Sequence, residues 1–435
     1  MVIGMKRVLP LLFALCPVVH GAEAAAPAED KSPLPLTEAI TLALRDGEAA
    51  QIAAARLDQA RAVERQAWSL VKPSATMSGS YGLNNASQRP WGGATSQGVS
   101  GNLTLDTTIF NARAFPAVKG AKASLEAQQY SSVELRRQLA FAAGDTFVAV
   151  AAAERIAAVA GRRVEVALEL QRAAERRVKA GLAVKADITR AESDVADARL
   201  AEIQANRTVT VGRLSLANVL GQTHLERPLG AVGDPPGVSG DPVALTTAAR
   251  ARRGDVAAAR LNLIVNARNI DQIDNGILPT VGIYTGVNDQ ESTANHPDPG
   301  WSAGLTARWA IYDGGLREAQ SDQQAAVGRE LAANLRTLER QVEREIRTAL
   351  ADLESAKQTV AQADARSRLA EAVANDTRAR YANGLATATE TADANQRAAE
   401  AAADRERRVL ETLSAALQLR QAVGHWPLTD QEPTP

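Results

Sequence analysis

Cysteine and histidine, which often carry out catalysis or bind metals, are scarce in this sequence of 435 residues. Cys16 is the only cysteine, and it lies in an N-terminal apolar stretch, so no disulfide framework is expected. No nucleophile motif or phosphate-binding glycine loop occurs, and no histidine lies at metal-ligand spacing. The sequence therefore predicts neither an enzyme nor a bound cofactor or metal. The four histidines are His20, His224, His296 and His425.

The residues with the most informative spacing lie in a duplicated segment. Residues 176–221 and 379–424 align without a gap at a constant offset of 203 (384 minus 181). Each copy holds a Gly-Leu-Ala turn whose glycine, Gly181 or Gly384, suits a helix C-cap that needs a left-handed residue. A period this long does not fit a solenoid, so the chain is interpreted as two similar halves.

Acidic residues follow each of these turns, at the start of the next helix. In a chain in which 23% of residues are charged, such an acid is most often a solvated residue on a helix face. Their spacing alone therefore leaves a functional role open. The acids are Asp187 in the first half, and Glu390 and Asp393 in the second half.

Long helices must position these turns. Apolar or small side chains recur at spacings of three and four residues before each turn, as in coiled-coil packing. Aromatic residues make up only 3% of the chain, and alanine cannot fill a thick core, so long thin helices are favoured over a compact globule. Each long helix would measure roughly 95 Å at ~1.5 Å per residue. The expected helices are 114–179 and 316–381, with return helices 185–220 and 388–423.

Two pairs of strands precede the long helices. Apolar and polar residues alternate with a period of two in 74–83, 99–110, 280–288 and 301–312. A water-soluble sheet shows the same alternation, but it also fits strands of a membrane barrel, which need ~9–11 residues with an apolar outer side. Since no bulky helix face is available to cover an apolar sheet surface, the barrel is favoured.

The remaining segments complete the expected organisation. Residues 1–24 have the charged start, apolar stretch and small-residue cleavage site of a signal peptide, which implies export. The first repeat then covers 25–221, opening with a helix over 34–70, and the second covers 243–424. A Gly- and Pro-rich linker, 222–242, joins them, and the tail 425–435 is expected to be disordered. The 49 basic and 50 acidic residues nearly cancel, which argues against nucleic-acid binding.

The chain resembles the TolC-like outer-membrane efflux proteins of Gram-negative bacteria over essentially its whole mature length. The matching segments are 36–44, the region around Leu245 with 252–255, the strand end 310–315, and both Gly-Leu-Ala turns. The resemblance implies an α+β membrane protein that forms a homotrimer. Four strands per chain would build one 12-stranded barrel in outer-membrane lipid, and the helices would build an α-helical barrel in the periplasm. A closed barrel is also what four strands with free edges require in lipid.

The resemblance also assigns roles to the turns and to the acids. Gly181, Leu182, Gly384 and Leu385 would contact a periplasmic adaptor (membrane fusion) protein, which is tied to an inner-membrane pump. In the family, acids six and nine positions after the second glycine form the inner constriction. Here those positions hold Glu390 and Asp393, with Asp187 equivalent in the first half. Three copies would raise carboxylate pKa values by repulsion and favour cations. The family often has an arginine where this chain has Ala386, so this chain lacks that arginine's ion-pair latch.

Trp301 and Tyr312 are interpreted as membrane-interface aromatics because they lie at strand ends, although ordinary packing is the alternative. The function implied by the resemblance is the exit duct of a tripartite efflux pump or of a type I secretion system. A soluble periplasmic coiled-coil scaffold and a stand-alone diffusion porin remain as alternatives. The pump selects the cargo, so drugs, metal ions and proteins all stay open.

Overall fold

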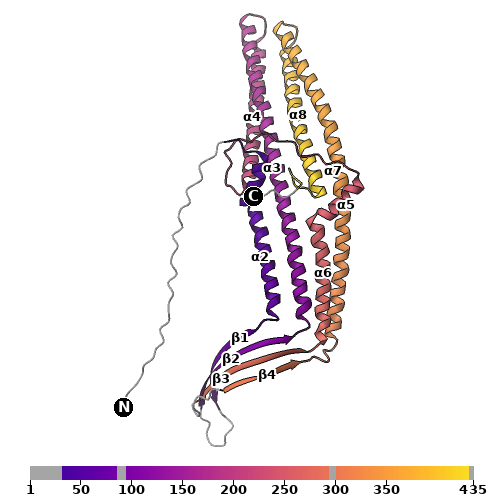
Figure 1. Cartoon of the computed structure of the whole chain (residues 1–435). Coiled ribbons are helices and arrows are strands. Elements are labelled where there is room, and N and C mark those ends of the chain that lie inside the picture. The colour runs from indigo at the N-terminus through magenta and orange to yellow at the C-terminus, as the bar shows by residue number, and fades with distance from the viewer. Residues whose placement is uncertain (1–31, 86–94, 293–299, 431–435) are drawn as a thin grey trace, which may run out of the picture.

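The structure is a computed structural model of the whole chain, and it describes residues 32–85, 95–292 and 300–430. The expected signal peptide 1–24, Trp91, His296 and the last five residues lie outside the described ranges. The described residues form a long molecule with a sheet at one end and two helical hairpins that reach the other end (Figure 1).

Each half contributes the same order of elements. Two helices lead into two strands, and the strands are followed by one very long helix and one return helix. The first half consists of α1 (Leu36–Asp46), α2 (Glu48–Ser69), β1 (Ser74–Asn85), β2 (Thr95–Phe110), α3 (Ala114–Lys179) and α4 (Lys185–Val219). The second half consists of α5 (Pro242–Arg252), α6 (Gly254–Asp274), the 3-10 helix η1 (Asn275–Ile277), β3 (Thr280–Ser292), β4 (Gly300–Arg308), α7 (Leu316–Ala382) and α8 (Ala388–Val423).

The single helix expected over 34–70 is wrong, because the chain breaks at Gly47. Gly47 adopts an extended conformation (φ −62°, ψ 135°) and separates α1 from α2. A Cβ at this position would lie 2.3 Å from the carbonyl oxygen of Ala43 and 3.4 Å from that of Val219. The break therefore lets the first helices pack closely against the end of return helix α4.

The four strands form one antiparallel sheet in the order β1-β2-β3-β4. The expected strand 301–312 is too long, since β4 ends at Arg308. Trp309 then leaves the ladder and donates its indole N–H to the carbonyl oxygen of Ile277, at 2.9 Å. Further on, Asp313 accepts hydrogen bonds from the backbone N–H groups of Gly315 and Arg317 and turns the chain into α7. Tyr312 thus lies beyond the sheet.

The strand register divides the sheet into an apolar face and a polar face. Met77 pairs with Leu103, Leu103 with Val287, and Val287 with Trp301, which places four exposed apolar side chains in one row across the sheet. The neighbouring row on the opposite face consists of Ser78, Asn102, Asn288 and Gly300. Among the described residues, the helices contain no stretch long and apolar enough to cross a membrane.

The largest apolar clusters lie midway along the molecule, where each return helix ends. The first surrounds Leu34, Ile40, Phe147 and Leu216, between α1, α3 and α4. The second surrounds Val256, Val342, Ile346, Leu419 and Val423, between α6, α7 and α8. These two clusters fix the positions of the long helices and return helices that carry the two Gly-Leu-Ala turns, which form the tips of the hairpins.

The tail expected to be disordered is ordered over 425–430. Arg420 on α8, only 2% exposed, donates to the backbone oxygens of Trp426 (2.9 Å), Thr429 (2.8 Å) and Pro236 (2.9 Å). It also pairs with Asp430 at 3.0 Å. One buried guanidinium therefore holds the tail and the linker against α8, a long-range arrangement that the residues of the tail do not reveal.

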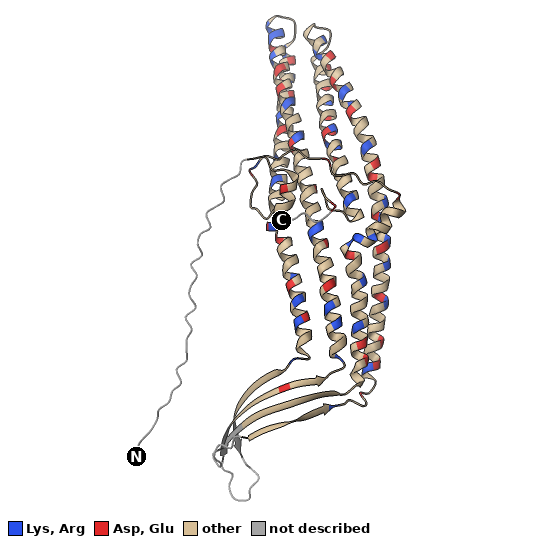
Figure 2. Cartoon of the chain, in the orientation of Figure 1, with Lys and Arg blue, Asp and Glu red and all other residues tan. Residues whose placement is uncertain are grey.

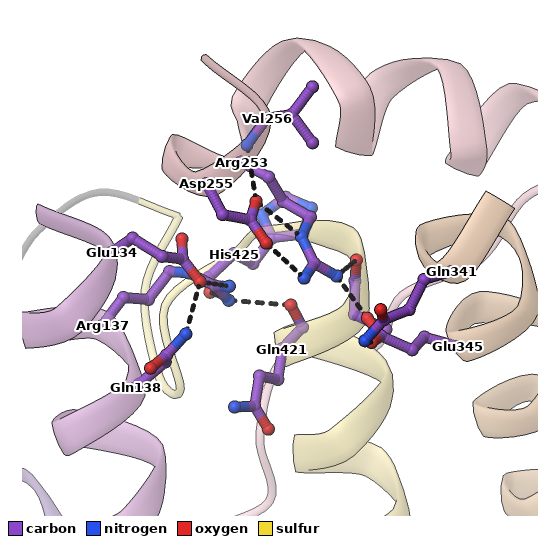
Figure 3. Close-up of polar contacts among 11 residues, drawn as sticks. Glu134, Arg137, Gln138, Arg253, Asp255, Val256, Gln341, Glu345, Gln421 and His425 are labelled. Carbon is purple, nitrogen blue, oxygen red and sulfur yellow. Dashed lines mark hydrogen bonds and ion pairs between the residues drawn. The ribbon is translucent and has the colours of Figure 1, made fainter. Parts of the chain in front are cut away.

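A second set of arginines connects helices near the same level (Figure 3). Arg137 on α3 pairs with Glu134 at 2.6 Å and donates to the carbonyl oxygens of Gln421 and His425. Arg253, between α5 and α6, pairs with Asp255 at 2.8 Å and with Glu345 at 2.5 Å. These bonds connect α3, α6, α7 and the end of α8.

Candidate functional site at the hairpin tips

The two hairpin tips have the same backbone geometry. Gly181 (φ +72°) and Gly384 (φ +77°) are both left-handed. The N–H of Leu182 donates to the carbonyl oxygen of Arg177 at 2.8 Å, and that of Leu385 donates to Arg380 at 2.8 Å. Each glycine N–H bonds to the carbonyl three residues earlier, which completes a Schellman motif at the end of α3 and of α7. A side chain with a Cβ would be strained at either glycine.

Each tip presents exposed apolar side chains. Leu182 is 70% exposed and Leu385 is 77% exposed, directly after the two glycines. Val184 is also exposed, but only in the first tip. These side chains belong to the turns that end the α3–α4 and α7–α8 hairpins, at the opposite end of the molecule from the sheet (Figure 1).

Glu390 has a local structural role that the sequence reasoning did not assign. Its carboxylate accepts hydrogen bonds from the backbone N–H (2.8 Å) and the hydroxyl (3.0 Å) of Thr387, while its own N–H donates to the Thr387 hydroxyl at 3.2 Å. This is a capping box at the start of α8, and the Thr-x-x-Glu sequence could have revealed it. Within one chain, the pKa of Glu390 is lowered, chiefly by the Thr387 backbone N–H. The rise in carboxylate pKa that the resemblance implies applies instead to three copies of the chain gathered around one pore.

Asp187 occupies the equivalent position in the first half, but its cap is weaker. Its carboxylate accepts a long hydrogen bond, 3.4 Å, from the N–H of Val184, and Val184 has no polar side chain to reciprocate. The Asp187 charge also acts on Tyr381 of the second hairpin. The pKa of Tyr381 is raised, first by burial, with Asp187 adding to the rise and Arg177 opposing it.

Glu390 and Asp393 share a groove between α7 and α8. The groove has a volume of about 810 Å³ and also contains Leu369, Val373 and Leu385. Asp187 does not line it. Asp393 instead acts on Asp194 of the first hairpin, whose pKa is raised by burial, by Asp197 and, more weakly, by Asp393. Within a single chain, carboxylates of the two hairpins therefore already lie near one another.

Two arginines connect the tips, and the sequence reasoning missed both. Arg177 on α3 donates to the carbonyl oxygen of Tyr381, and its guanidinium lies 4.7 Å from the centre of the Tyr381 ring. Arg190 on α4 donates to the hydroxyl of Thr389 on α8 at 2.5 Å. Only the three-dimensional pairing of the hairpins shows these contacts, since Arg190 and Thr389 lie 199 residues apart.

The two expected interface aromatics lie toward opposite ends of the sheet. Trp301, 81% exposed, lies near the start of β4, and Tyr312, 87% exposed, lies past its end. The structure also exposes further apolar side chains where strands meet helices, and of these the alternation pattern had indicated only Trp309 and Ile311. The further exposed side chains are Phe110, Phe115, Ile277, Leu278, Trp309 and Ile311.

Within the residues that the structure describes, no three His, Cys, Asp or Glu side chains gather closely enough to hold a metal ion.

Comparison with known proteins gives a family match over most of the chain. The family model described as "Outer membrane efflux protein" matches residues 40–222 and 245–425. A curated relative, the fusaric acid resistance protein FusA of Burkholderia cepacia, is 28% identical over 158 residues. That match covers 34% of this chain and 29% of the relative, so this chain aligns with less than a third of that protein.

Solved structures share the fold along nearly the whole chain. The Campylobacter jejuni CmeC outer membrane channel superposes with a TM-score of 0.76 at 16% identity, covering 92% of this chain and 87% of that one. The Vibrio cholerae outer membrane protein VceC gives a TM-score of 0.74 at 19% identity, covering 90% and 96%. At these identities the likeness concerns the fold alone.

Proposed function

The chain belongs to the outer membrane efflux protein family, and we propose that it is the outer-membrane exit duct of a tripartite efflux pump or type I secretion system. In this role it would conduct cargo across the outer membrane and part of the periplasm of a Gram-negative bacterium. The family is one of channels, and catalysis forms no part of the proposal.

The observation that carries the proposal is the incomplete sheet. Strands β1 and β4 are both edge strands, and each leaves one side of its backbone unpaired within the chain. The apolar row of the sheet is exposed, and it consists of Met77, Leu103, Val287 and Trp301. Lipid suits such a face, but lipid does not tolerate open edges. Three copies, with β4 of each pairing with β1 of the next, would close twelve strands and turn the polar row toward a water-filled lumen.

The helices would form the periplasmic part of the same trimer. Exposed apolar side chains occur along α4, at Leu200, Ile203, Val211 and Leu214, and on α7, at Leu369 and Val373. Burial of such side chains stabilises association by ~25 cal/mol per Å² of apolar area. A neighbouring copy on each side of the hairpins would cover both sets and complete a helical tube.

Disulfide cross-linking tests the barrel directly, because a chain cleaved after residue 24 contains no cysteine. A panel that pairs Ala75→Cys or Met77→Cys on β1 with Trp301→Cys or Ala303→Cys on β4 samples the registers of the closing edge. The expected product is a covalent trimer with at least one pair, and monomers with each single-cysteine control. Monomers throughout the panel would contradict the closed barrel and favour a soluble scaffold.

We further propose that Glu390 and Asp393, with Asp187, narrow the pore at the periplasmic end. The groove that Glu390 and Asp393 share, together with the nearby Asp194, supports the gathering of carboxylates there. Glu390→Gln with Asp393→Asn should reduce cation selectivity in planar bilayers, since fewer carboxylates attract cations. Glu371→Gln, an exposed acid of α7, is the matched control. Unchanged selectivity in the double variant would remove both residues from the pore.

The turns at Gly181, Leu182, Gly384 and Leu385 are proposed to contact a periplasmic adaptor that is joined to an inner-membrane pump. Their exposed leucines at the far end of the rods support this role. Gly384→Trp with Leu385→Ser should abolish efflux while the trimer still assembles and inserts. Normal efflux by the double variant would contradict the adaptor contact.

Trp301 and Tyr312 are proposed to lie at the two membrane interfaces, since they lie toward opposite ends of the sheet. The cargo is a separate question. The partial match to the fusaric acid resistance protein supports a small organic molecule as cargo, and drug-susceptibility measurements on a deletion strain test it. Large, unselective conductance without any efflux defect would instead favour a stand-alone diffusion porin.

A further inference from the structure

The first hairpin tip carries cations that have no ion-pair partner among the residues that the structure describes. Arg176, Lys179 and Lys185 are exposed around the turn at Gly181. None of the three makes an ion pair or a side-chain hydrogen bond with any residue in the described ranges. Arg177, in the same segment, is already engaged by Tyr381. The tip therefore presents three positive charges to its surroundings.

The second tip has the same shape, but its charges are largely satisfied within the hairpin. Arg380 pairs with Asp376 at 2.9 Å. Arg378 donates to Asn375, and Glu390 is held by Thr387. Figure 2 shows basic residues at the end of the α3–α4 hairpin, while the end of the α7–α8 hairpin is mainly uncharged. The two tips thus differ in charge although they share a backbone.

The cations of the first tip surround an apolar centre. Leu182 and Val184 are both exposed at the turn, between Lys179 on one side and Lys185 on the other. An apolar centre with a charged rim is the usual composition of a transient protein interface. Rim charges set the partner's charge and the rate of encounter more than the final affinity.

We propose that the first tip is the charge-selective half of the adaptor contact, and that it takes an apolar turn of the adaptor flanked by Asp or Glu residues. Leu182 and Val184 would receive the apolar turn, and Arg176, Lys179 and Lys185 would pair with the flanking carboxylates. The second tip would contact the adaptor without a preference for charge. The proposal rests on the proposed exit-duct function and gives its partner a defined chemistry.

Binding of designed probes to the full mature chain in detergent tests this inference. The probes are three disulfide-closed helical hairpins with leucine at the turn, identical except for flanking Glu, Gln or Lys residues. We expect the Glu hairpin to bind about ten-fold more tightly than the Gln hairpin in fluorescence anisotropy at low salt. The preference should shrink when salt rises to about 1 M, where the Debye length is only ~3 Å.

Matched variants assign the preference to the first tip. Arg176→Gln, Lys179→Gln and Lys185→Gln together should remove it while weak binding of all hairpins remains. The control removes three charges from the second hairpin, through Arg378→Gln, Arg380→Gln and Arg397→Gln. This control variant should keep the preference for the Glu hairpin. An equal affinity for the three hairpins, or a preference that survives in the first-tip variant, would overturn the proposal.

Two further outcomes separate the alternatives. Strong binding to phosphatidylglycerol vesicles, but not to phosphatidylcholine vesicles, that is lost in the first-tip variant would assign the cations to a lipid surface and overturn the adaptor proposal. If the purified chain is a conducting trimer and shows no hairpin preference, only the charge inference fails. A non-conducting monomer would overturn the proposed function, and this inference would fail with it.

Discussion

The two halves build the same mid-molecule junction from different side chains. In the first half, Gly221 ends α4 against the break between α1 and α2, and a Cβ there would lie 2.5 Å from the carbonyl oxygen of Asp46. In the second half, Gly424 ends α8 against the break between α5 and α6, where the residue at the break is Arg253 rather than glycine. The first junction depends on close backbone contact, and the second on charged side chains.

This difference shows which features the duplication holds constant. Both junctions and both tips have a left-handed glycine at equivalent positions, Gly181 and Gly384 at the tips and Gly221 and Gly424 at the junctions. The side chains around these glycines differ, because a junction between helices can be stabilised either by apolar packing or by buried polar groups whose hydrogen bonds are satisfied. Buried charges are costly to desolvate, so removing one partner should harm the second junction more than trimming one contact harms the first.

The largest expected effect is the loss of Arg420, which has no counterpart at the first junction because Ala217 occupies the equivalent position. Arg420→Ala leaves three backbone carbonyls without their donor and releases the tail. We expect the free energy of unfolding in denaturant to fall by about 3–5 kcal/mol. Hydrogen exchange of residues 425–430 should rise to the rate of an unprotected chain.

An exposed arginine provides the control. Arg347 pairs with Glu343 on the surface of α7, and Arg347→Ala should cost no more than ~0.5 kcal/mol. Equal losses in the two variants would mean that the second junction does not depend on its buried arginine.

Substitution of Gly221 is the change that should destabilise the first junction most. Gly221→Ala adds a strained left-handed residue, costing ~1–2 kcal/mol, and a backbone collision, costing ~1–3 kcal/mol more. Gly181→Ala has the same backbone angle but open space around the new Cβ, so only the strain applies. Thermal unfolding of the two variants measures the difference, and a Gly181→Ala variant as unstable as Gly221→Ala would contradict the close contact.

The tips permit a reciprocal exchange of helix caps. Thr387→Val should weaken the start of α8 by about 1 kcal/mol, since it removes the hydroxyl of the capping box. Val184→Thr should stabilise the start of α4 by a comparable amount, because Asp187 already lies at the third position. Hydrogen exchange in the first turn of each helix reports both effects. No change in either turn would show that the caps do not control the tips.

The smallest expected effect is a pH dependence confined to the second junction. Arg252 donates to Nε2 of His425 at 2.9 Å, so Nδ1 carries the proton and donates to Asp430 at 2.9 Å. Burial, then Arg252 and Arg420, lower the pKa of His425 below 6.5, while Asp430 opposes them. Arg137, from α3, reaches the backbone oxygen of the same residue.

Because the folded pKa is lowered, the neutral form stabilises the fold above the unfolded pKa, and this contribution disappears as pH falls through the folded pKa. Exchange of residues 426–430, corrected for intrinsic rates, should therefore rise on going from about pH 7.5 to about pH 5. Arg252→Gln should reduce this dependence. An equally steep dependence in the variant would show that Arg252 does not set it.

Local patterns were enough to place the rods, the turns and the strand pairs. Helix α3 and helix α7 end just before the glycines that the repeat singles out, and period-two alternation finds all four strands. The resemblance to outer-membrane efflux proteins is confirmed by the family match. The end of β4 was misjudged because Trp309 and Ile311 continue the alternation after the ladder has stopped.

Contacts between distant segments could not be predicted. The Arg177–Tyr381 and Arg190–Thr389 contacts depend on how the two hairpins lie together, and the ordered tail depends on Arg420. No periodicity in the sequence encodes these pairings. The capping box of Thr387 and Glu390, in contrast, was visible in the sequence as a local motif.

The most direct test of the proposed exit duct is the oligomer mass of the detergent-purified mature protein followed by its single-channel conductance in a planar bilayer. A trimer with small, cation-selective conductance steps is the expected result, since three open sheets would close one barrel whose periplasmic end is lined by carboxylates. A single-chain mass without channel activity would contradict it, because the strands would then never close a barrel.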